Sequence, residues 1–358
     1  MKKGVLVCLG TARKKNIGDY MQSLAARQFA GGDAVLVERE RIDRYAGGPT
    51  RLVMNGWFMH HPSRFPPSED IVPLFVSFHV KPKIENRLLT ERAVAYLRKH
   101  EPIGCRSTEM VDMLARHGIR GEYTSCLTLT LGETYRHIPA DTPPVFVDPY
   151  LRELPLRAHP FRALGRMLSR VPYALAHAGK LLRLSRRFKG CCRHFPGTWL
   201  PPIRWYYLVE FHRVYSTAFS DELLLSADYL SHGCERTKDT SDETLMAQAE
   251  ALMRRYERAP YVVTSRLHCA LPCIGIGTPV WVPFCPSMTS GRFGGNADFM
   301  NVLTFGPDGR CQPPAGGKIT PATPPPPVRT EHRPFAEALA GRCRDFFREG
   351  EGQGVGSK

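Results

Sequence analysis

Short apolar runs alternate with longer amphipathic stretches along the first part of the chain, a pattern typical of strands followed by helices. Val5 to Leu9 is the first apolar run, and the stretch from Tyr20 to Phe29 has helical spacing. Similar segments predict strands at 34–37, 51–55, 71–78, 103–105 and 122–131, and helices at 91–99 and 107–117. This alternation predicts a mostly parallel, doubly wound sheet.

The same alternation starts again near residue 144. Strands are expected at 144–148, 223–232, 262–265 and 279–283, and helices at 242–257 and 267–276. The predicted fold class is therefore α/β, with two Rossmann-like domains that face a cleft. We expect an N-terminal domain over 1–140, a C-terminal domain over 141–310, a Pro-rich strap over 311–330, a last helix over 331–348 and a disordered tail over 349–358.

A basic helical insertion is expected at about 154–210. Leu154 to Val209 contains no Asp or Glu. Its cations include Arg157, Arg162, Arg166, Arg170, Lys180, Arg183, Arg186, Arg187, Lys189 and Arg193. Apolar residues at steps of three and four share one helical face: Phe161, Leu164, Leu168, Val171, Leu175, Ala178 and Leu182. Pro172 is expected to split this helix or to start a second one.

Two interpretations of the insertion stay open. Its apolar stripe packs on the domain and leaves solvated arginines, or it lies at a membrane interface, attracted to anionic lipid or a lipid-linked polyanion. An aromatic cluster follows, for which we expect core positions: Trp199, Trp205, Tyr206 and Tyr207.

The formal net charge of +15 predicts an acidic partner: nucleic acid, an anionic membrane or a negatively charged substrate. Nucleic-acid-binding sequence signatures are absent, so no nucleic-acid partner is expected. The first apolar run is shorter than a signal-peptide core, and no apolar run reaches transmembrane length. The eleven cysteines lack C-x-x-C spacing, which indicates reduced thiols in a cytosol. Cys269 and Cys273 are expected as buried apolar groups, and no metal site is assigned.

The strongest chemical signal is the run from Tyr261 to Ala270, where a β-branched strand ends in Ser265, Arg266 and His268. A strand that leads into a helix leaves backbone N–H groups unpaired, and Arg266 adds a planar fork suited to phosphate or carboxylate. His268 can exchange a proton beside such an anion. This segment predicts an anion-binding site.

Other candidate residues also follow strands. Arg106 closes the short strand at 103–105, and His79 follows the apolar strand at 71–78. Asn16 and Asp19 follow the first strand, where open α/β sheets bind ligands, although Asp19 can equally serve as a helix N-cap. His232, at the end of the expected strand 223–232, is a further cleft candidate.

The ordered motifs resemble those of the polysaccharide pyruvyl transferases. The resemblance rests on Asn16-Ile17-Gly18-Asp19, Gly104-Cys105-Arg106-Ser107, Gly118-Ile119, Cys126-Leu127-Thr128-Leu129, Thr264-Ser265-Arg266-Leu267-His268 and Gly277-Thr278-Pro279. It covers residues up to about 131 and roughly 223–300, and it implies a glycosyltransferase-B-like fold. Phe75-Val76-Ser77 replaces the family's Pro-Gln-Ser before His79, so the match of His79 is the weakest.

The resemblance implies a donor, phosphoenolpyruvate, whose pyruvyl group becomes a ketal on two sugar hydroxyls. Arg106, Arg266, Leu267 and Ser265 would then bind the donor, with His268 and His79 exchanging protons in either order. No metal or organic cofactor is implied. The expected partner is a glycan or lipid-linked oligosaccharide, and the expected place is the cytoplasm, at the inner face of the membrane. Two alternatives remain: a sugar-nucleotide glycosyltransferase of the same fold, and a non-catalytic polyanion-binding protein.

Overall fold

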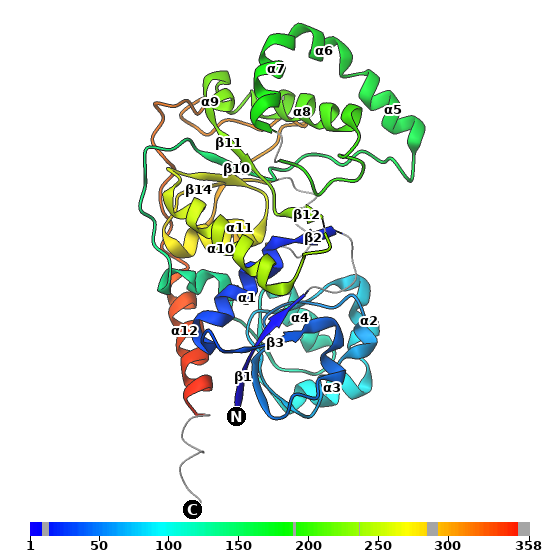
Figure 1. The fold of residues 1–358 in the computed structure, drawn as a ribbon, viewed down its shortest axis with the longest axis vertical. Coiled ribbons are helices and arrows are strands. Elements are labelled where there is room, and N and C mark those ends of the chain that lie inside the picture. Colours follow the sequence, from blue (N-terminus) through cyan, green and yellow to red (C-terminus); the bar gives the residue numbers. More distant parts are fainter. Residues whose placement is uncertain (9–13, 189–190, 236, 285–292, 350–358) are drawn as a thin grey trace, which may run out of the picture.

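The computed structural model describes residues 1–8, 14–188, 191–235, 237–284 and 293–349. The two predicted α/β halves lie one above the other along the long axis of the molecule, and a group of helices forms the end beyond the C-terminal half (Figure 1).

The N-terminal half contains two short parallel sheets that continue one another. Their orders are β3-β1-β4-β6 and β5-β7-β8-β9. The strands are β1 (Lys2–Val7), β3 (Val35–Glu38), β4 (Thr50–Val53), β5 (Gly56–Phe58), β6 (Ile71–Leu74), β7 (Phe78–Val80), β8 (Ile103–Cys105) and β9 (Gly121–Tyr123). The Met54 N–H donates to the Leu74 carbonyl at 2.8 Å and the Gly56 N–H to the Ser77 carbonyl at 3.1 Å, which joins the sheets.

The strand predicted at 71–78 is therefore two strands, β6 and β7. Ser77 between them has a φ of 56°, a left-handed conformation that interrupts an extended chain. The helices of this half cover the sheets: α1 (Ile17–Ala30), η1 (Arg39–Arg44), η2 (Pro62–Arg64), η3 (Pro82–Ile84), α2 (Glu85–Leu88), α3 (Glu91–Arg98) and α4 (Thr108–Arg116).

The strand predicted over 122–131 is wrong beyond its first residues. β9 ends at Tyr123, and η4 (Leu127–Glu133) is a 3₁₀ helix. Its leucines and threonines are all buried, so the alternation of apolar and polar residues does not mark a buried and an exposed face. The hydroxyl of Thr130 bonds locally, to the Leu127 carbonyl at 2.7 Å, which favours the helical turn.

The C-terminal half is built on one parallel sheet of order β11-β10-β13-β14-β15. Its strands and helices are β10 (Val145–Val147), α9 (Asp221–Ser226), β11 (Asp228–Leu230), α10 (Asp242–Arg258), β13 (Val262–Thr264), α11 (Leu267–Ile276), β14 (Val280–Pro283), η7 (Ala297–Phe299) and β15 (Asn301–Leu303). The strand predicted at 223–232 is wrong in its first part. Ser220 accepts the Leu223 N–H at 3.3 Å and caps helix α9 there.

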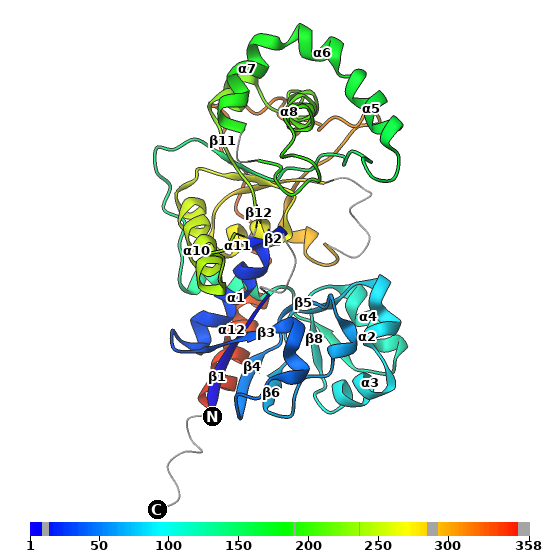
Figure 2. The same ribbon diagram turned by 45° about the vertical axis from the view of Figure 1, so that its right-hand side comes forward.

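The predicted insertion contains α5 (Pro160–Leu168), α6 (Val171–Ala176), α7 (Ala178–Arg187) and α8 (Pro201–Tyr215). Helices α5 to α7 form an arc around α8 (Figure 2). Pro172 lies in the first turn of α6, so this proline starts a second helix. The core prediction holds for Tyr206 and Tyr207, whereas Trp199 is 73% and Trp205 38% exposed.

The two halves share one hydrophobic core, to which α1, η4, α10 and α11 all contribute. The Tyr20 hydroxyl on α1 donates to Asp242 Oδ1 on α10 at 2.6 Å, and β2 (Lys14–Asn16) pairs with β12 (Gly233–Glu235). The last helix, α12 (Arg333–Arg348), packs Leu339 and other apolar residues against the same core. The segment before it, 312–330, holds no helix or regular strand, and the predicted tail lies outside the described residues from 350 onward.

None of the described helices is both long and apolar enough to cross a lipid bilayer.

Candidate active site

Three candidate residues follow neighbouring strands of the C-terminal sheet. Strand β10 pairs in parallel with both β11 and β13, so the carboxyl ends of all three strands meet at one edge. Asp148 follows β10, His232 follows β11 by two residues, and Arg266 follows β13 by two residues. The sheet topology therefore brings together side chains that lie far apart in the sequence.

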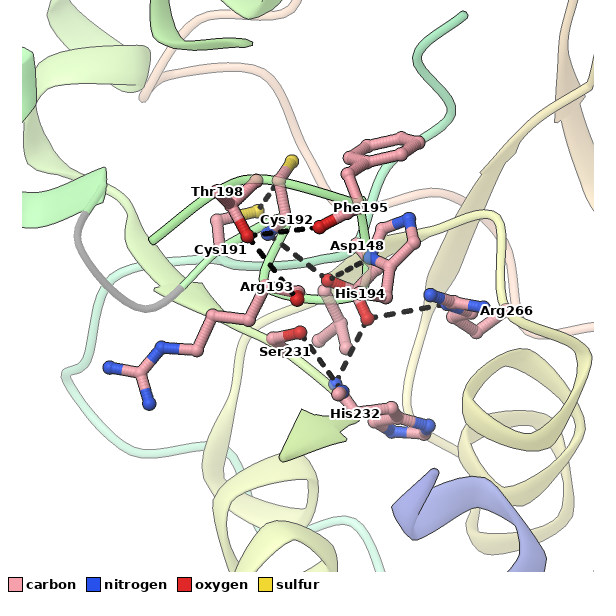
Figure 3. A network of polar contacts seen from close by, with 12 residues as sticks. Asp148, Cys191, Cys192, Arg193, His194, Phe195, Thr198, Ser231, His232 and Arg266 are labelled. Carbon is pink, nitrogen blue, oxygen red and sulfur yellow. Dashed lines mark hydrogen bonds and ion pairs between the residues drawn. The ribbon is translucent and has the colours of Figure 1, made fainter. Parts of the chain in front are cut away.

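Asp148 is the centre of this group (Figure 3). Its Oδ1 accepts the backbone N–H of Cys192 at 3.2 Å and lies 3.2 Å from His194 Nδ1. Its Oδ2 accepts the backbone N–H of His232 at 3.0 Å and the Nε–H of Arg266 at 3.2 Å. Asp148 adopts a φ of 40°, which Asp tolerates better than most residues.

The Asp148 carboxylate is charged. Its burial alone would raise the pKa, but the hydrogen bond from His194 and the positive charge of Arg266 outweigh the burial. The pKa of Asp148 is therefore well below its usual value. This fixed negative charge holds Arg266 at the strand end.

Arg266 is positioned from two sides. Its Nε binds Asp148, and its backbone N–H donates to the Thr264 hydroxyl at 3.0 Å. The side chain is 20% exposed, and among the described residues its two terminal nitrogens have no hydrogen-bond partner. The outer edge of the guanidinium is thus available to an anionic ligand.

Ser265 and Leu267, which flank Arg266 in the sequence, have different surroundings. The Ser265 hydroxyl donates to the Pro283 carbonyl at 2.8 Å and accepts the Tyr150 N–H at 2.8 Å, so it links the end of β14 to the loop after β10. The Leu267 side chain is buried in the shared core. Leu267 is the first residue of α11, and its backbone N–H has no acceptor in the described part of the chain.

Arg106 and His268 meet across the boundary between the two halves. Arg106 follows β8 of the N-terminal half, and its Nη1 lies 3.4 Å from Nε2 of His268 on α11. Asn296 fixes the Arg106 backbone by donating its Nδ2–H to the Arg106 carbonyl at 3.0 Å. Its Oδ1 accepts the Ser125 hydroxyl at 2.6 Å.

Arg106 is a buried cation without a paired anion. It is 5% exposed, no carboxylate among the described residues forms an ion pair with it, and its Nε has no partner there. Burial lowers the pKa of this guanidinium, while the charges of Cys126 and Asp19 act in the opposite direction. Because arginine stays protonated in proteins, this site favours a bound anion.

The start of α1 packs against both histidines. A Cβ at Gly18 would lie 3.2 Å from His232 Nδ1, His268 Cβ and Asn16 Oδ1, so a larger residue would crowd this contact. The Ile17 N–H also donates to the His232 carbonyl at 2.8 Å. His232 itself is buried, and its Nε2 lies 2.8 Å from the Tyr256 hydroxyl. His232 is therefore enclosed between the start of α1 and Tyr256 of α10.

The N-cap interpretation of Asp19 is wrong. Asn16 is the N-cap of α1, because its Oδ1 accepts the Gly18 N–H at 3.2 Å. Asp19 lies one turn further on, half-buried, with its Oδ1 3.5 Å from Gln22 Nε2.

His79 lies beside Arg106 in the N-terminal sheet. Phe78 of β7 pairs with Cys105 of β8, and the Arg106 N–H donates to the Phe78 carbonyl at 3.0 Å. The next positions in this parallel register are His79 and Arg106, whose side chains are expected on the same face. The sheet thus brings the second predicted histidine next to the first predicted arginine.

Three residues of this network were not predicted from the sequence. Asp148 follows an apolar strand. The same signal indicated Arg106 and Arg266, so Asp148 could have been predicted in the same way. His194 and Asn296 belong to loops whose local sequence carries no such signal. Cys269 and Cys273 are fully buried in α11, as expected. The described residues contain no group of three or more His, Cys, Asp or Glu side chains that could hold a metal ion.

The fold and the site define an α/β protein with a cationic, histidine-containing site between two parallel sheets. The family model for the polysaccharide pyruvyl transferases matches residues 16–282, three quarters of the chain. The chain belongs to this family. The matched range also includes the basic insertion, which the motif comparison left out. No curated protein matches the chain.

Proposed function

We propose that this protein transfers the pyruvyl group of phosphoenolpyruvate to two hydroxyls of a sugar, forming a pyruvate ketal in cell-surface glycan biosynthesis. The observation that carries the proposal is the contact of Arg106 with His268. A buried cation that forms no ion pair with any described residue lies beside a group that can exchange protons. Family membership makes the protein a transferase that acts on polysaccharide.

The two arginines suit the two anionic groups of the donor. Phosphoenolpyruvate carries a carboxylate and a phosphate, which Arg106 and Arg266 would bind from the two halves. The Leu267 amide at the start of α11 adds a donor for the same anion. Asp148 and Asn296 hold the arginines in place before the ligand arrives, so little reorganisation is needed.

The chemistry is an addition followed by loss of phosphate. His268 delivers a proton to C3 of the enol, and the positive charge that develops at C2 is captured by a sugar hydroxyl, whose proton His79 accepts. The C2–O bond to phosphate then breaks, and the second hydroxyl attacks C2 and closes the ketal. The proton of this hydroxyl passes to His268 and restores it, while the proton held by His79 leaves with the phosphate. The products are the ketal and inorganic phosphate, so the atoms and charges balance without a metal or an organic cofactor.

The reverse assignment of the two histidines agrees with the same contacts. The contact of Arg106 with His268 places this histidine beside the proposed anion, where it can exchange a proton. Deuterium incorporation at C3 in heavy water, retained in His79→Gln and lost in His268→Gln, identifies His268 as the acid.

The architecture we propose for turnover is glycosyltransferase-B-like, with domains 1–140 and 141–310 on either side of the site. The acceptor is a glycan or a lipid-linked oligosaccharide at the cytoplasmic face of the membrane. Asn16 and Asp19, at the start of α1, are proposed to contact the acceptor.

The test is release of phosphate from phosphoenolpyruvate in the presence of a panel of methyl glycosides and oligosaccharides. We expect acceptor-dependent release that falls at least 100-fold in His268→Gln, because proton transfer of this kind contributes that much. His159→Gln, an exposed histidine of the insertion at the start of α5, is the matched control and should keep full activity. Acceptor-dependent release that survives in His268→Gln would refute the role of this histidine.

A further inference from the structure

The apolar stripe of helices α5 to α7 faces outward. Its residues Phe161, Leu164, Leu168, Val171, Leu175 and Leu182 are 47–87% exposed. A different set of residues on these helices packs against the body of the protein: Ala163, Met167, Tyr173, Ala174, Leu181 and Leu184. The interpretation that the stripe packs on the domain is therefore wrong, because another apolar face does so.

The cations around the arc fall into two groups. One group attaches the arc to the body: Arg170 to Glu210 at 2.6 Å, Lys180 to Asp221 at 2.5 Å and Arg187 to Asp228 at 3.4 Å. The second group is exposed and forms no ion pair with any described residue: Arg157, Arg162, Arg183, Arg186 and Arg204. These unpaired arginines flank the exposed stripe. On α7, for example, Leu182 lies one turn from Arg186.

The position of the arc also fits a planar partner. Figures 1 and 2 place α5, α6 and α7 at one end of the long axis, beyond α8 and far from α12. Both exposed tryptophans, Trp199 and Trp205, belong to the segment that leads into and forms α8. Beside α7 a mostly apolar pocket of about 400 Å³ is lined by Phe188, Leu208, Trp205 and Arg204, among others. Apolar groups, tryptophans and arginines at one end are the composition of an interfacial surface.

We propose that this arc, residues 157–187, binds the surface of an anionic lipid bilayer, with the six stripe residues in the acyl-chain boundary and the unpaired arginines among the headgroups. The occupant is a bilayer because a flat array of negative charge over an apolar layer complements both features at once. Electrostatic attraction alone would leave the leucines in water, and apolar burial alone would leave the arginines without partners. This binding does not depend on the transfer chemistry proposed above.

The test is flotation of the purified full-length protein with vesicles of phosphatidylcholine containing about one third phosphatidylglycerol, against vesicles of phosphatidylcholine alone. We expect binding to the anionic vesicles that weakens with added salt. Replacing Arg162, Arg183 and Arg186 by Gln should lower the partition coefficient on the order of 100-fold, at about fivefold per cation. The matched control replaces Arg41, Arg87 and Arg92, exposed arginines elsewhere, and should lower it much less.

The apolar contribution is tested by Leu164→Asp with Leu175→Asp. These exposed positions tolerate a polar residue, so the fold should persist, while vesicle binding should fall more than tenfold. Ile138→Asp is the control, since Ile138 is 69% exposed but lies outside the arc. Wild-type protein that fails to float with anionic vesicles would overturn the proposal. A protein that forms dimers, and whose dimers dissociate when Leu164 and Leu175 are replaced, would also overturn the proposal. Binding of nucleic acid in preference to vesicles would overturn it as well.

Discussion

At the scale of single residues, the site is organised by one buried carboxylate and one buried cation that do not pair with each other. Asp148 receives four polar contacts and holds Arg266, whereas Arg106 has no carboxylate partner among the described residues. An unpaired buried cation is costly unless a ligand provides the missing charge. The proposed donor would supply the missing negative charge at Arg106, whereas the charge of Asp148 is already balanced by its contact with Arg266.

Replacing Asp148 by Asn should destabilise the protein. The variant leaves Arg266 without a counter-charge, and the loss at neutral pH is expected to be about 3–5 kcal/mol of unfolding free energy. The folded-state pKa of Asp148 is depressed, so the contribution of its charge is complete above its ordinary value of about 3.9 and is lost as the pH falls through the folded-state pKa.

Chemical denaturation at several pH values measures the difference in unfolding free energy between wild type and Asp148→Asn. The difference between wild type and variant should shrink in acid, and Asp141→Asn, at an exposed position, should show no comparable difference at any pH. A difference that stays constant down to low pH would mean that the carboxylate charge is not what Asp148 contributes.

At the scale of elements, the bounds of a strand or helix are predicted best where all its residues follow one pattern of apolar and polar positions. The ranges expected for β8 and α11 agree with the structure, and Arg106 and Arg266 follow strands as expected, because a short apolar run followed by a polar residue marks a strand end. The prediction failed for η4, because its leucines and threonines are all buried and do not alternate between a buried and an exposed face. It failed again at Ser77, where one backbone angle interrupts a strand. The partners His194 and Asn296 reach the site only through tertiary packing.

Helix α11, which carries His268, packs closely against η4. Gly275 allows this close contact because it has no side chain. A Cβ at Gly275 would lie 2.3 Å from the Leu129 carbonyl oxygen, which belongs to the backbone and cannot move cheaply. Gly275→Ala should therefore destabilise the protein by about 1–3 kcal/mol and lower turnover by displacing α11.

Thermal denaturation together with the phosphate-release assay tests the predicted effects of Gly275→Ala on stability and turnover. Gly341→Ala in α12, where nothing lies within 4 Å of the added Cβ, is the control and should be neutral or stabilising. Equal stability of the two variants would show that η4 yields to the added methyl group.

At the scale of the whole molecule, the two α/β halves are not separate bodies. Helix α1 of the N-terminal half packs into a core that also contains α10 and α11, and α12 returns to that core from the end of the described chain. The site lies on this boundary, since Arg106 and His268 come from opposite halves. The insertion has a second core of its own around α8, which leaves its outer arc available to a membrane.

A shared core predicts one cooperative unfolding transition for the two halves. Scanning calorimetry should show a single main endotherm with equal calorimetric and van't Hoff enthalpies. Two well-separated endotherms of similar size, assigned to the two halves by limited proteolysis, would contradict the shared core.

The central claim is that the cationic site binds phosphoenolpyruvate. Titration calorimetry with this donor and, separately, with a nucleotide sugar tests it most directly, on wild type, Arg106→Gln, Arg266→Gln and the control Arg87→Gln. We predict saturable binding of phosphoenolpyruvate that weakens at least tenfold in both site variants and is unchanged in the control, because each charged hydrogen-bonding group contributes about 1.5–3 kcal/mol. No binding at millimolar phosphoenolpyruvate, together with binding of the nucleotide sugar, would contradict the claim and favour a glycosyltransferase.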